Sequence, residues 1–182
     1  MNDETRLPAH GLNVPLDLDL DRVPQRPFTI HEACVLPDWI DYNGHMNVAY
    51  YVLAFDRATD RFFDLVDLGV DYVSRTNHSA FVLETHVGYR QEVGEGDPLR
   101  FDFQLLGVDD KRVQFYFEMF HADQGYLAAT SELIVVHVDL GARRSAAFPA
   151  PLRARLDAIM AAHANLPQPA GAGRTIALRP PR

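Results

Sequence analysis

Residues 47–67 form a long segment that contains neither glycine nor proline. The large apolar residues of this segment recur at intervals of three and four, which places them along one stripe of a helix. They are Tyr51, Val52, Phe55, Phe62, Phe63 and Val66. Asn47 stands at the expected N-cap position, where an asparagine side chain accepts a hydrogen bond from a free amide of the first turn. The pattern predicts an amphipathic helix over residues 47–67.

Apolar and polar residues alternate with a period of two on both sides of this helix, which is typical of β-strands. The predicted strands cover residues 29–35, 81–90, 99–107, 112–121 and 126–138. Turn residues join the last four strands, so we expect each of them to pair antiparallel with the next along the chain. A short amphipathic helix over residues 151–163 follows. This order predicts an α+β fold, with a five-stranded antiparallel sheet around one long helix.

Alternation along residues 81–90 gives the predicted second strand two faces. Thr85 shares one face with Phe81, Leu83 and Val87 and is expected to point inward, toward substrate. Glu84 and His86 are expected on the opposite face. A solvated or subunit-facing surface is the more ordinary role for two such residues, although they also form a candidate acid–base pair.

One helix is too small to cover a five-stranded sheet, so we expect an exposed face or edge to pair with a second copy, in a homodimer or a dimer of dimers. Proline-rich segments flank the patterned region. They suggest an N-terminal arm over residues 1–27, a folded domain over 28–165 and a C-terminal tail over 166–182.

Composition narrows the class of protein. The chain has 182 residues, 47% of them hydrophobic, and a formal net charge of -8. An acidic chain is a poor partner for nucleic acid or an anionic membrane. Cys34 is the one cysteine, and the first residues lack the basic start and apolar run of a signal peptide. We therefore expect a cytoplasmic protein without internal disulfides. Arg90, Arg112, Arg143 and Arg144 are candidates for binding phosphate.

Reactive side chains are concentrated directly before the long helix, in residues 41–47 (DYNGHMN). Free amides at a helix N-terminus carry partial positive charge and suit a developing oxyanion. Gly44 permits a bend and a close approach of substrate. Asp41 could act there as general base or nucleophile toward a carbonyl group. On spacing alone, the same residues also fit an ordinary turn with local hydrogen bonds.

The region 29–138 resembles the hotdog-fold acyl-CoA thioesterases of the 4-hydroxybenzoyl-CoA thioesterase-like superfamily. The residues that carry this resemblance are Asp41, Gly44, His45, Met46, Asn47 and Tyr51, together with Tyr89 before the turn at residues 94–97. The resemblance implies a hotdog fold and hydrolysis of an acyl-CoA thioester. It implies that Asp41 is the catalytic carboxylate, that amides near Gly44 and His45 polarise the carbonyl, and that Asn47 belongs to the same catalytic group.

Residues 38–46 (DWIDYNGHM) resemble more narrowly the thioesterases of bacterial carnitine breakdown, including those fused to carnitine dehydrogenases, which hydrolyse betainyl-CoA. This resemblance implies a quaternary ammonium at the far end of the acyl group, which aromatic faces can bind. The candidate substrate-binding residues are Trp39, Tyr42, Tyr50, Tyr51, Glu84, Thr85 and His86. If the aromatic residues only pack the loop and helix, the pocket takes a neutral acyl group instead.

Two other functions remain open. A hotdog enoyl-acyl hydratase or dehydratase uses an aspartate–histidine pair, but the spacing from Asp41 to His45 is one residue short of that pattern. A non-catalytic acyl-CoA-binding protein is the second alternative. No group of residues has metal-ligand spacing and no glycine-rich nucleotide motif occurs, so we expect neither a metal nor a cofactor.

Overall fold

The computed structural model describes residue 19 and residues 22–178, so most of the predicted N-terminal arm lies outside the described residues. The elements are β1 (Phe28–Cys34), the 3-10 helix η2 (Pro37–Trp39), α1 (Val48–Leu65), α2 (Val70–Thr76), β2 (His78–Tyr89), β3 (Pro98–Val108), β4 (Arg112–His121), β5 (Leu127–Asp139), β6 (Arg144–Ser145) and α3 (Ala150–His163). The long helix, the five long strands and the last helix are therefore confirmed close to their predicted bounds.

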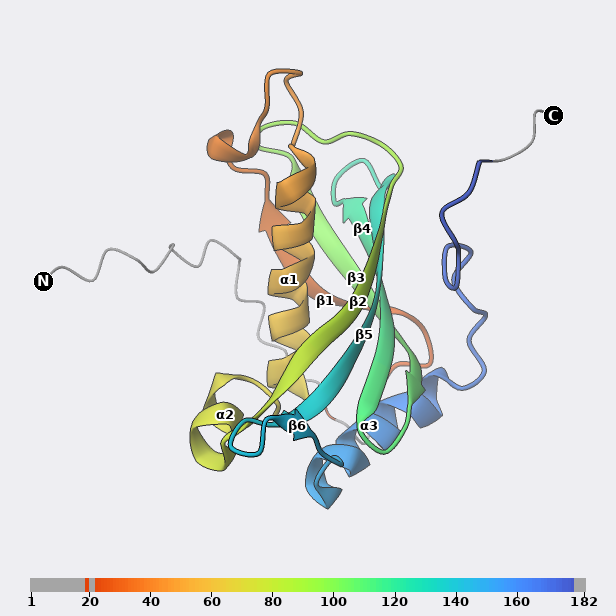
Figure 1. Cartoon of the computed structure of the whole chain (residues 1–182). Helices are drawn as coiled ribbons and strands as arrows, with labels where there is room; N and C mark the ends of the chain where they lie inside the picture. Colours follow the sequence, from red (N-terminus) through yellow and green to blue (C-terminus); the bar gives the residue numbers. More distant parts are fainter. Residues whose placement is uncertain (1–18, 20–21, 179–182) are drawn as a thin grey trace, which may run out of the picture.

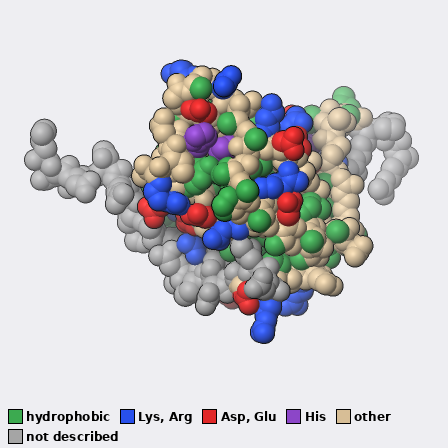
Figure 2. Space-filling model, turned by 90° about the horizontal axis from the view of Figure 1, so that it is seen from below, with side chains coloured by type: hydrophobic (Ala, Val, Ile, Leu, Met, Phe, Trp, Pro, Cys, Tyr) green, Lys and Arg blue, Asp and Glu red, His purple; other side chains and the backbone are tan. Residues whose placement is uncertain are grey.

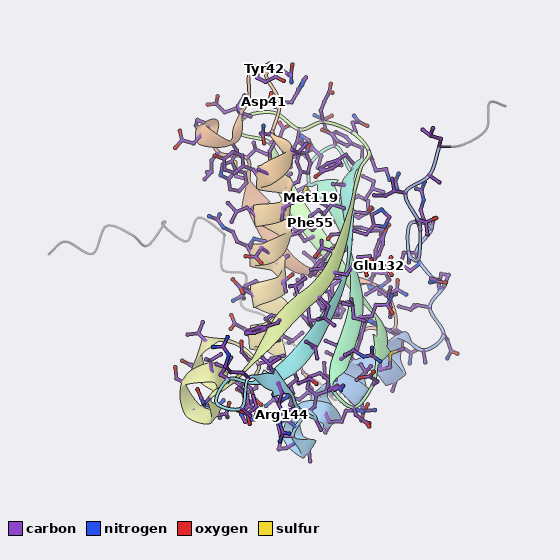
Figure 3. All side chains as sticks on the ribbon, viewed as in Figure 1. Asp41, Tyr42, Phe55, Met119, Glu132 and Arg144 are labelled. Atoms are coloured by element: carbon purple, nitrogen blue, oxygen red, sulfur yellow. The ribbon has the colours of Figure 1, made fainter. Side chains whose placement is uncertain are left out.

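The apolar stripe of α1 packs against one face of a curved antiparallel sheet (Figure 1). Phe55 and Phe62 are fully buried and meet phenylalanine rings of β3 and β4, including a stacked pair in which the Phe62 and Phe103 centroids lie 4.6 Å apart. Figure 3 shows Phe55 and Met119 between the helix and the sheet. This aromatic layer is the main core, and it confirms the expected α+β hotdog arrangement.

The strand order corrects one expectation. The sheet runs β1-β3-β4-β5-β2, so β2 pairs with β5 and not with β3. The connection over residues 90–97 crosses the end of the sheet (Figure 1) and is fastened to the β1 side by hydrogen bonds between Gly96 and Val35 and between Val35 and Asp97. Turn residues indicated a reversal of the chain correctly, but eight residues are long enough to reach past the neighbouring strands.

The predicted faces of β2 are also wrong for part of the strand. The register with β5 shifts between Val82 and Glu84, which makes a β-bulge at Leu83. A bulge adds one residue and exchanges the faces of the residues before it. Thr85 therefore shares the helix-facing side with Val82, whereas Phe81 shares the outer side with Glu84. As the last strand of the sheet, β2 leaves Thr85 exposed in the single chain.

A short helix, α2, was missed by the analysis of periodicity. It begins after Gly69, carries Asp71 in its first turn and ends at Asn77, which adopts the left-handed conformation with a φ of 56°. These are ordinary helix end signals. Its seven residues are too few for an apolar period to show.

The helix α3 packs at the end of the sheet that is opposite Asp41, and the tail that follows it runs along the outer face, opposite α1 (Figure 1). His163 accepts a hydrogen bond from the Leu105 amide, and the Gln104 side chain donates one to the Pro167 carbonyl. Further along, the Gly173 amide donates to a carboxylate oxygen of Glu132 at 2.7 Å. The tail to residue 178 therefore has defined contacts with the sheet.

Charged side chains of both signs are interspersed on the end of the molecule that carries α2, β6 and α3 (Figure 2). This face offers no large patch of one sign. Within residues 22–178, no helix combines the length and the apolar character needed to cross a bilayer.

His31 on β1 is a buried histidine. Its ring is 6% exposed, lies 5.2 Å from the Phe101 ring, and its Nε2 atom has no hydrogen-bond partner among the described residues. Burial, and then the positive charges of Arg61 and Arg57, lower the pKa of His31 from 6.5 to about 4. The folded protein therefore holds this imidazole neutral.

We predict that His31 makes the protein less stable in mild acid. Between pH 6.5 and about 4 the unfolded chain protonates this histidine while the folded chain does not, so the free energy of unfolding falls as the pH is lowered. Urea unfolding of wild type and His31→Gln at several pH values checks this. The free energy of unfolding should depend less on pH in the variant than in wild type. Some pH dependence should remain in both, because burial also lowers the pKa of His137 and of His163. Parallel profiles for the two proteins would contradict the assignment.

Candidate active site

The loop between β1 and α1 is a small closed hairpin. Ile40 and Met46 form an antiparallel bridge, and the Asp41 amide donates to the His45 carbonyl at 3.0 Å. Within the loop, the Gly44 amide donates to the Asp41 carbonyl at 3.0 Å. Gly44 has a φ of 81°, a conformation that residues with a Cβ rarely adopt. The glycine is therefore needed to close the turn that presents Asp41.

This loop is fastened to the rest of the fold at its base. The Met46 amide donates to the Val93 carbonyl at 2.9 Å, and the Asn47 amide donates to the Trp39 carbonyl at 2.9 Å. Met46 itself is 4% exposed and belongs to the core. Asp41 and Tyr42 consequently lie together at one end of the molecule, beside the start of α1 (Figure 3).

The Asp41 carboxylate is oriented by two neighbours. Its Oδ1 atom accepts a hydrogen bond from the Asn43 amide at 2.8 Å, and its Oδ2 atom accepts one from the Asn47 side-chain amide at 3.4 Å. The other side-chain atom of Asn47, Oδ1, accepts from the Ala49 amide at 3.0 Å and caps the helix. Asn47 is therefore the helix cap that the sequence predicts, and the same side chain also contacts the Asp41 carboxylate.

The backbone amides of the loop are not equally available. Gly44 uses its N–H within the turn, whereas the amides of His45 and Val48 make no hydrogen bond among those found in the described loops and caps. Val48 is the first residue of α1, where helix amides lack a partner and carry partial positive charge. A carbonyl oxygen beside Asp41 could accept from these two amides. Of the donors expected near Gly44 and His45, the Gly44 amide is occupied and the His45 amide is a candidate. The Val48 amide is a further candidate that the sequence analysis did not name.

His45 points toward the loop after β2. Its Nε2 atom lies 3.5 Å from a carboxylate oxygen of Glu92, and both side chains are largely exposed. Within residues 22–178 no hydrogen bond joins the His45 ring to Asp41. The arrangement lacks the aspartate–histidine pair that a hydratase would use.

The three aromatic residues closest in sequence to Asp41 differ in accessibility. Trp39 is 3% exposed, with Tyr50 stacked on it at 5.6 Å and the Arg57 guanidinium 5.4 Å from its ring centroid. A ring enclosed in this way, beside a positive charge, has no open face for a cation. Tyr42, in contrast, is 96% exposed at the tip of the loop, and Tyr50 is half-buried.

A second aromatic pair lies where α1 faces the end of β2. The rings of Tyr51 and Tyr89 meet edge to face at 5.2 Å, and Tyr89 is 47% exposed. Burial raises the pKa of Tyr51, and a hydrogen bond from the Val93 amide opposes that rise. Sequence reasoning treated Tyr89 as a marker of the strand. Its position one residue before the connection that holds the Asp41 loop could have suggested a place at the site.

The remaining candidates are not gathered around Asp41 within one chain. Thr85 lies on the helix-facing side of β2, while Glu84 and His86 lie on the outer face, beneath the tail. The outer position agrees with the expectation that Glu84 and His86 face away from the core. In the part of the chain that the structure describes, no group of three or more histidine, cysteine or acidic residues could hold a metal ion.

Comparison with known proteins identifies the family of this chain. The family model of the thioesterase-like superfamily matches residues 35–156. The betainyl-CoA thioesterase of Pseudomonas aeruginosa is 41% identical over 156 residues, which are 85% of this chain and 97% of that protein.

Two solved structures share the fold. A hypothetical protein from Staphylococcus aureus, determined in complex with CoA, has a TM-score of 0.79 and 26% identity, over 87% of this chain and 99% of its own. A putative thioesterase from Pseudomonas putida has a TM-score of 0.73 and 32% identity, over 85% of this chain and 99% of its own.

The fold is therefore that of the hotdog thioester hydrolases. The chain belongs to the thioesterase-like superfamily.

Proposed function

We propose that this protein hydrolyses betainyl-CoA to glycine betaine and CoA, with Asp41 as the catalytic carboxylate. One observation carries the proposal: Asp41 is held by Asn47 beside amides of the helix start that are free to bind a carbonyl oxygen. The 41% identity with a betainyl-CoA thioesterase, over nearly the whole length of that relative, supports the choice of acyl group.

The catalytic step needs two groups that this loop supplies. The Asp41 carboxylate attacks the thioester carbonyl, either directly or by taking a proton from a water molecule that attacks in its place. Negative charge then develops on the carbonyl oxygen, where the amides of His45 and Val48 stabilise it together with the helix dipole. Collapse of the intermediate breaks the carbon–sulfur bond and releases the CoA thiolate, which takes up the proton that water gives. On the direct route the acyl group remains on Asp41 as an anhydride, and a water molecule then hydrolyses it to free glycine betaine. Asn47 keeps the carboxylate in position throughout.

Recognition of the quaternary ammonium falls to exposed aromatic rings. Such a cation donates no hydrogen bond and accepts none, so aromatic faces bind it through their quadrupoles, at about 0.5 to 2 kcal/mol each. Tyr42 and Tyr50 are the accessible members of the sequence-derived aromatic set, and Tyr89, which packs on the buried Tyr51, adds a second accessible wall. Trp39 supports Tyr50 from beneath.

We further propose a homodimer, or a dimer of dimers, that acts in the cytoplasm and assembles through β2. This strand is the last of the sheet, and it exposes Phe81, Val82 and Leu83 by 53%, 47% and 57%. A long apolar edge strand is a template for pairing with a second chain. Pairing through β2 would bring Thr85 of a second copy toward the site.

Asp41→Asn should abolish turnover while leaving the fold intact. The amide keeps the shape of the carboxylate but is neither nucleophile nor base, so we expect kcat to fall by about 100-fold or more. Release of CoA thiol from an acyl-CoA panel measures the rate. Asp38→Asn is the matched control, because Asp38 is exposed on η2 and should tolerate the change. If Asp41→Asn keeps more than about a tenth of the wild-type rate, Asp41 is not the catalytic residue.

Light scattering tests the assembly. We expect a particle of at least twice the 20.5 kDa chain mass at micromolar concentration. Leu83→Lys should shift it toward monomer and lower activity, because it places a charge in the paired edge. Val70→Lys, at a position 78% exposed on α2, should change neither property. An active monomeric wild type would show that the site does not need a partner.

The acyl specificity can be tested with a neutral isostere in which a carbon atom replaces the quaternary nitrogen of betainyl-CoA. Wild type should prefer the cation more than about tenfold in kcat/KM. Tyr42→Leu should lose part of that preference, whereas Tyr42→Phe keeps the aromatic face and should retain it. Equal kcat/KM values for the two substrates in wild type would exclude cation recognition and leave a thioesterase for neutral acyl groups.

A further inference from the structure

Two adjoining cavities lie on the outer face of the sheet, between β2 and the C-terminal tail. The first, of about 320 Å³, contains the carboxylates of Glu84 and Glu132. The second, of about 230 Å³, contains no carboxylate. Its lining comes from His86, Gly88, Arg90, Thr130, Gly171, Arg174, Thr175, Ile176 and Ala177. We call this second cavity the strap pocket, because tail residues 171–177 close it from outside.

The strap pocket joins two guanidinium groups from distant parts of the chain. Arg90 comes from the end of β2 and Arg174 from the tail. The Arg90 amide donates to the Ala128 carbonyl at 2.9 Å, but within residues 22–178 neither guanidinium group makes an ion pair or a hydrogen bond. In a protein with a net charge of -8, two such arginines around a cavity without carboxylates favour an anionic ligand.

The Arg90 guanidinium lies between two glycines, Gly88 of β2 and Gly171 of the tail. Its Nη2 atom lies 3.5 Å from the point where a Cβ on Gly88 would stand, and 3.4 Å from the corresponding point on Gly171. A Cβ on Gly171 would also collide with the Tyr116 hydroxyl. The tail approaches the sheet this closely only because it has a glycine there, so the pocket depends on the sequence of the tail.

The pocket lies at the same end of the sheet as Asp41. Arg90 directly follows Tyr89, whose ring meets Tyr51 on the helix side. The connection that begins at Arg90 continues to Val93, which holds the base of the Asp41 loop. A ligand that extends around the end of β2 could therefore reach both places.

We propose that the strap pocket binds phosphate groups of the CoA part of the substrate, with Arg90 and Arg174 as the charged partners. The inference rests on the proposed function, since it assigns the nucleotide end of the same acyl-CoA. Arginine presents paired N–H donors that match phosphate oxygens, and Thr175 adds a hydroxyl at the wall. The C-terminal tail is then part of the binding site.

Kinetics with phosphate-free substrates test this assignment. Arg174→Gln and Arg90→Gln should each raise KM for betainyl-CoA about tenfold or more, with kcat nearly unchanged. Neither should affect KM for betainyl-pantetheine, which lacks every phosphate. Arg75→Gln is the control, because it removes the same charge from an exposed position on α2, where Arg75 pairs with Asp67 at 2.7 Å. An equal rise in KM for both substrates would show that the arginines only maintain the fold, and would overturn the proposal.

Direct binding separates this proposal from the proposed function. Calorimetry with CoA alone needs no turnover, and both arginine variants should weaken CoA binding while leaving that of pantetheine unchanged. Inorganic phosphate distinguishes the source of the anion. If it binds the strap pocket in competition with CoA, the assignment stands; if it binds there without displacing CoA, the pocket serves a separate phosphate ligand and the assignment fails. Unchanged CoA binding in both variants would overturn it as well, whatever the protein hydrolyses.

Discussion

The packing of α1 against the sheet is the constraint on which the site depends. Phe55 and Phe62 are locked among aromatic rings of β3 and β4, and this fixes the axis and the start of the helix. Asn47 caps the first turn of α1, and its side chain also donates to the Asp41 carboxylate. The position of the helix start therefore sets the position of this carboxylate. The geometry of the candidate site is a consequence of core packing.

The edge of the sheet and the tail extend the site beyond this loop. Since β2 is the last strand, its helix-facing residues are open to a second chain at the end where Tyr89 meets Tyr51. On the other side of the same strand, the tail encloses Arg90 and Arg174. One strand thus separates the proposed thioester region from the proposed phosphate region, and a single long substrate could contact both of its faces.

Local patterns in the sequence were sufficient for most of the fold. The stripe from Tyr51 to Val66 and the alternation of the strands depend only on neighbouring residues, so α1 and the five long strands were predictable. The pairing of β2 with β5 was not, because turn residues show where a chain reverses and not which strand it then joins. The bulge at Leu83 was not predictable for a related reason. One inserted residue exchanges the faces of the strand without interrupting its apolar pattern.

The candidate site also has a part that was predictable from the sequence and a part that was not. Asp41, Gly44 and Asn47 lie within one segment of seven residues, so their grouping was visible in the sequence. The enclosure of Trp39 by Tyr50 and Arg57 depends on helix packing, and the meeting of Arg90 with the tail depends on contacts across more than eighty residues. No local pattern reports such contacts.

The central claim is that the thioester carbonyl lies between Asp41 and the amides at the start of α1. A crystal structure with a non-hydrolysable betainyl-CoA analogue, in which a methylene group replaces the thioester sulfur, tests it most directly. The account predicts the analogue's carbonyl oxygen within hydrogen-bond distance of the His45 or Val48 amide, with the Asp41 carboxylate facing the carbonyl carbon. A carbonyl group bound away from this loop would contradict it.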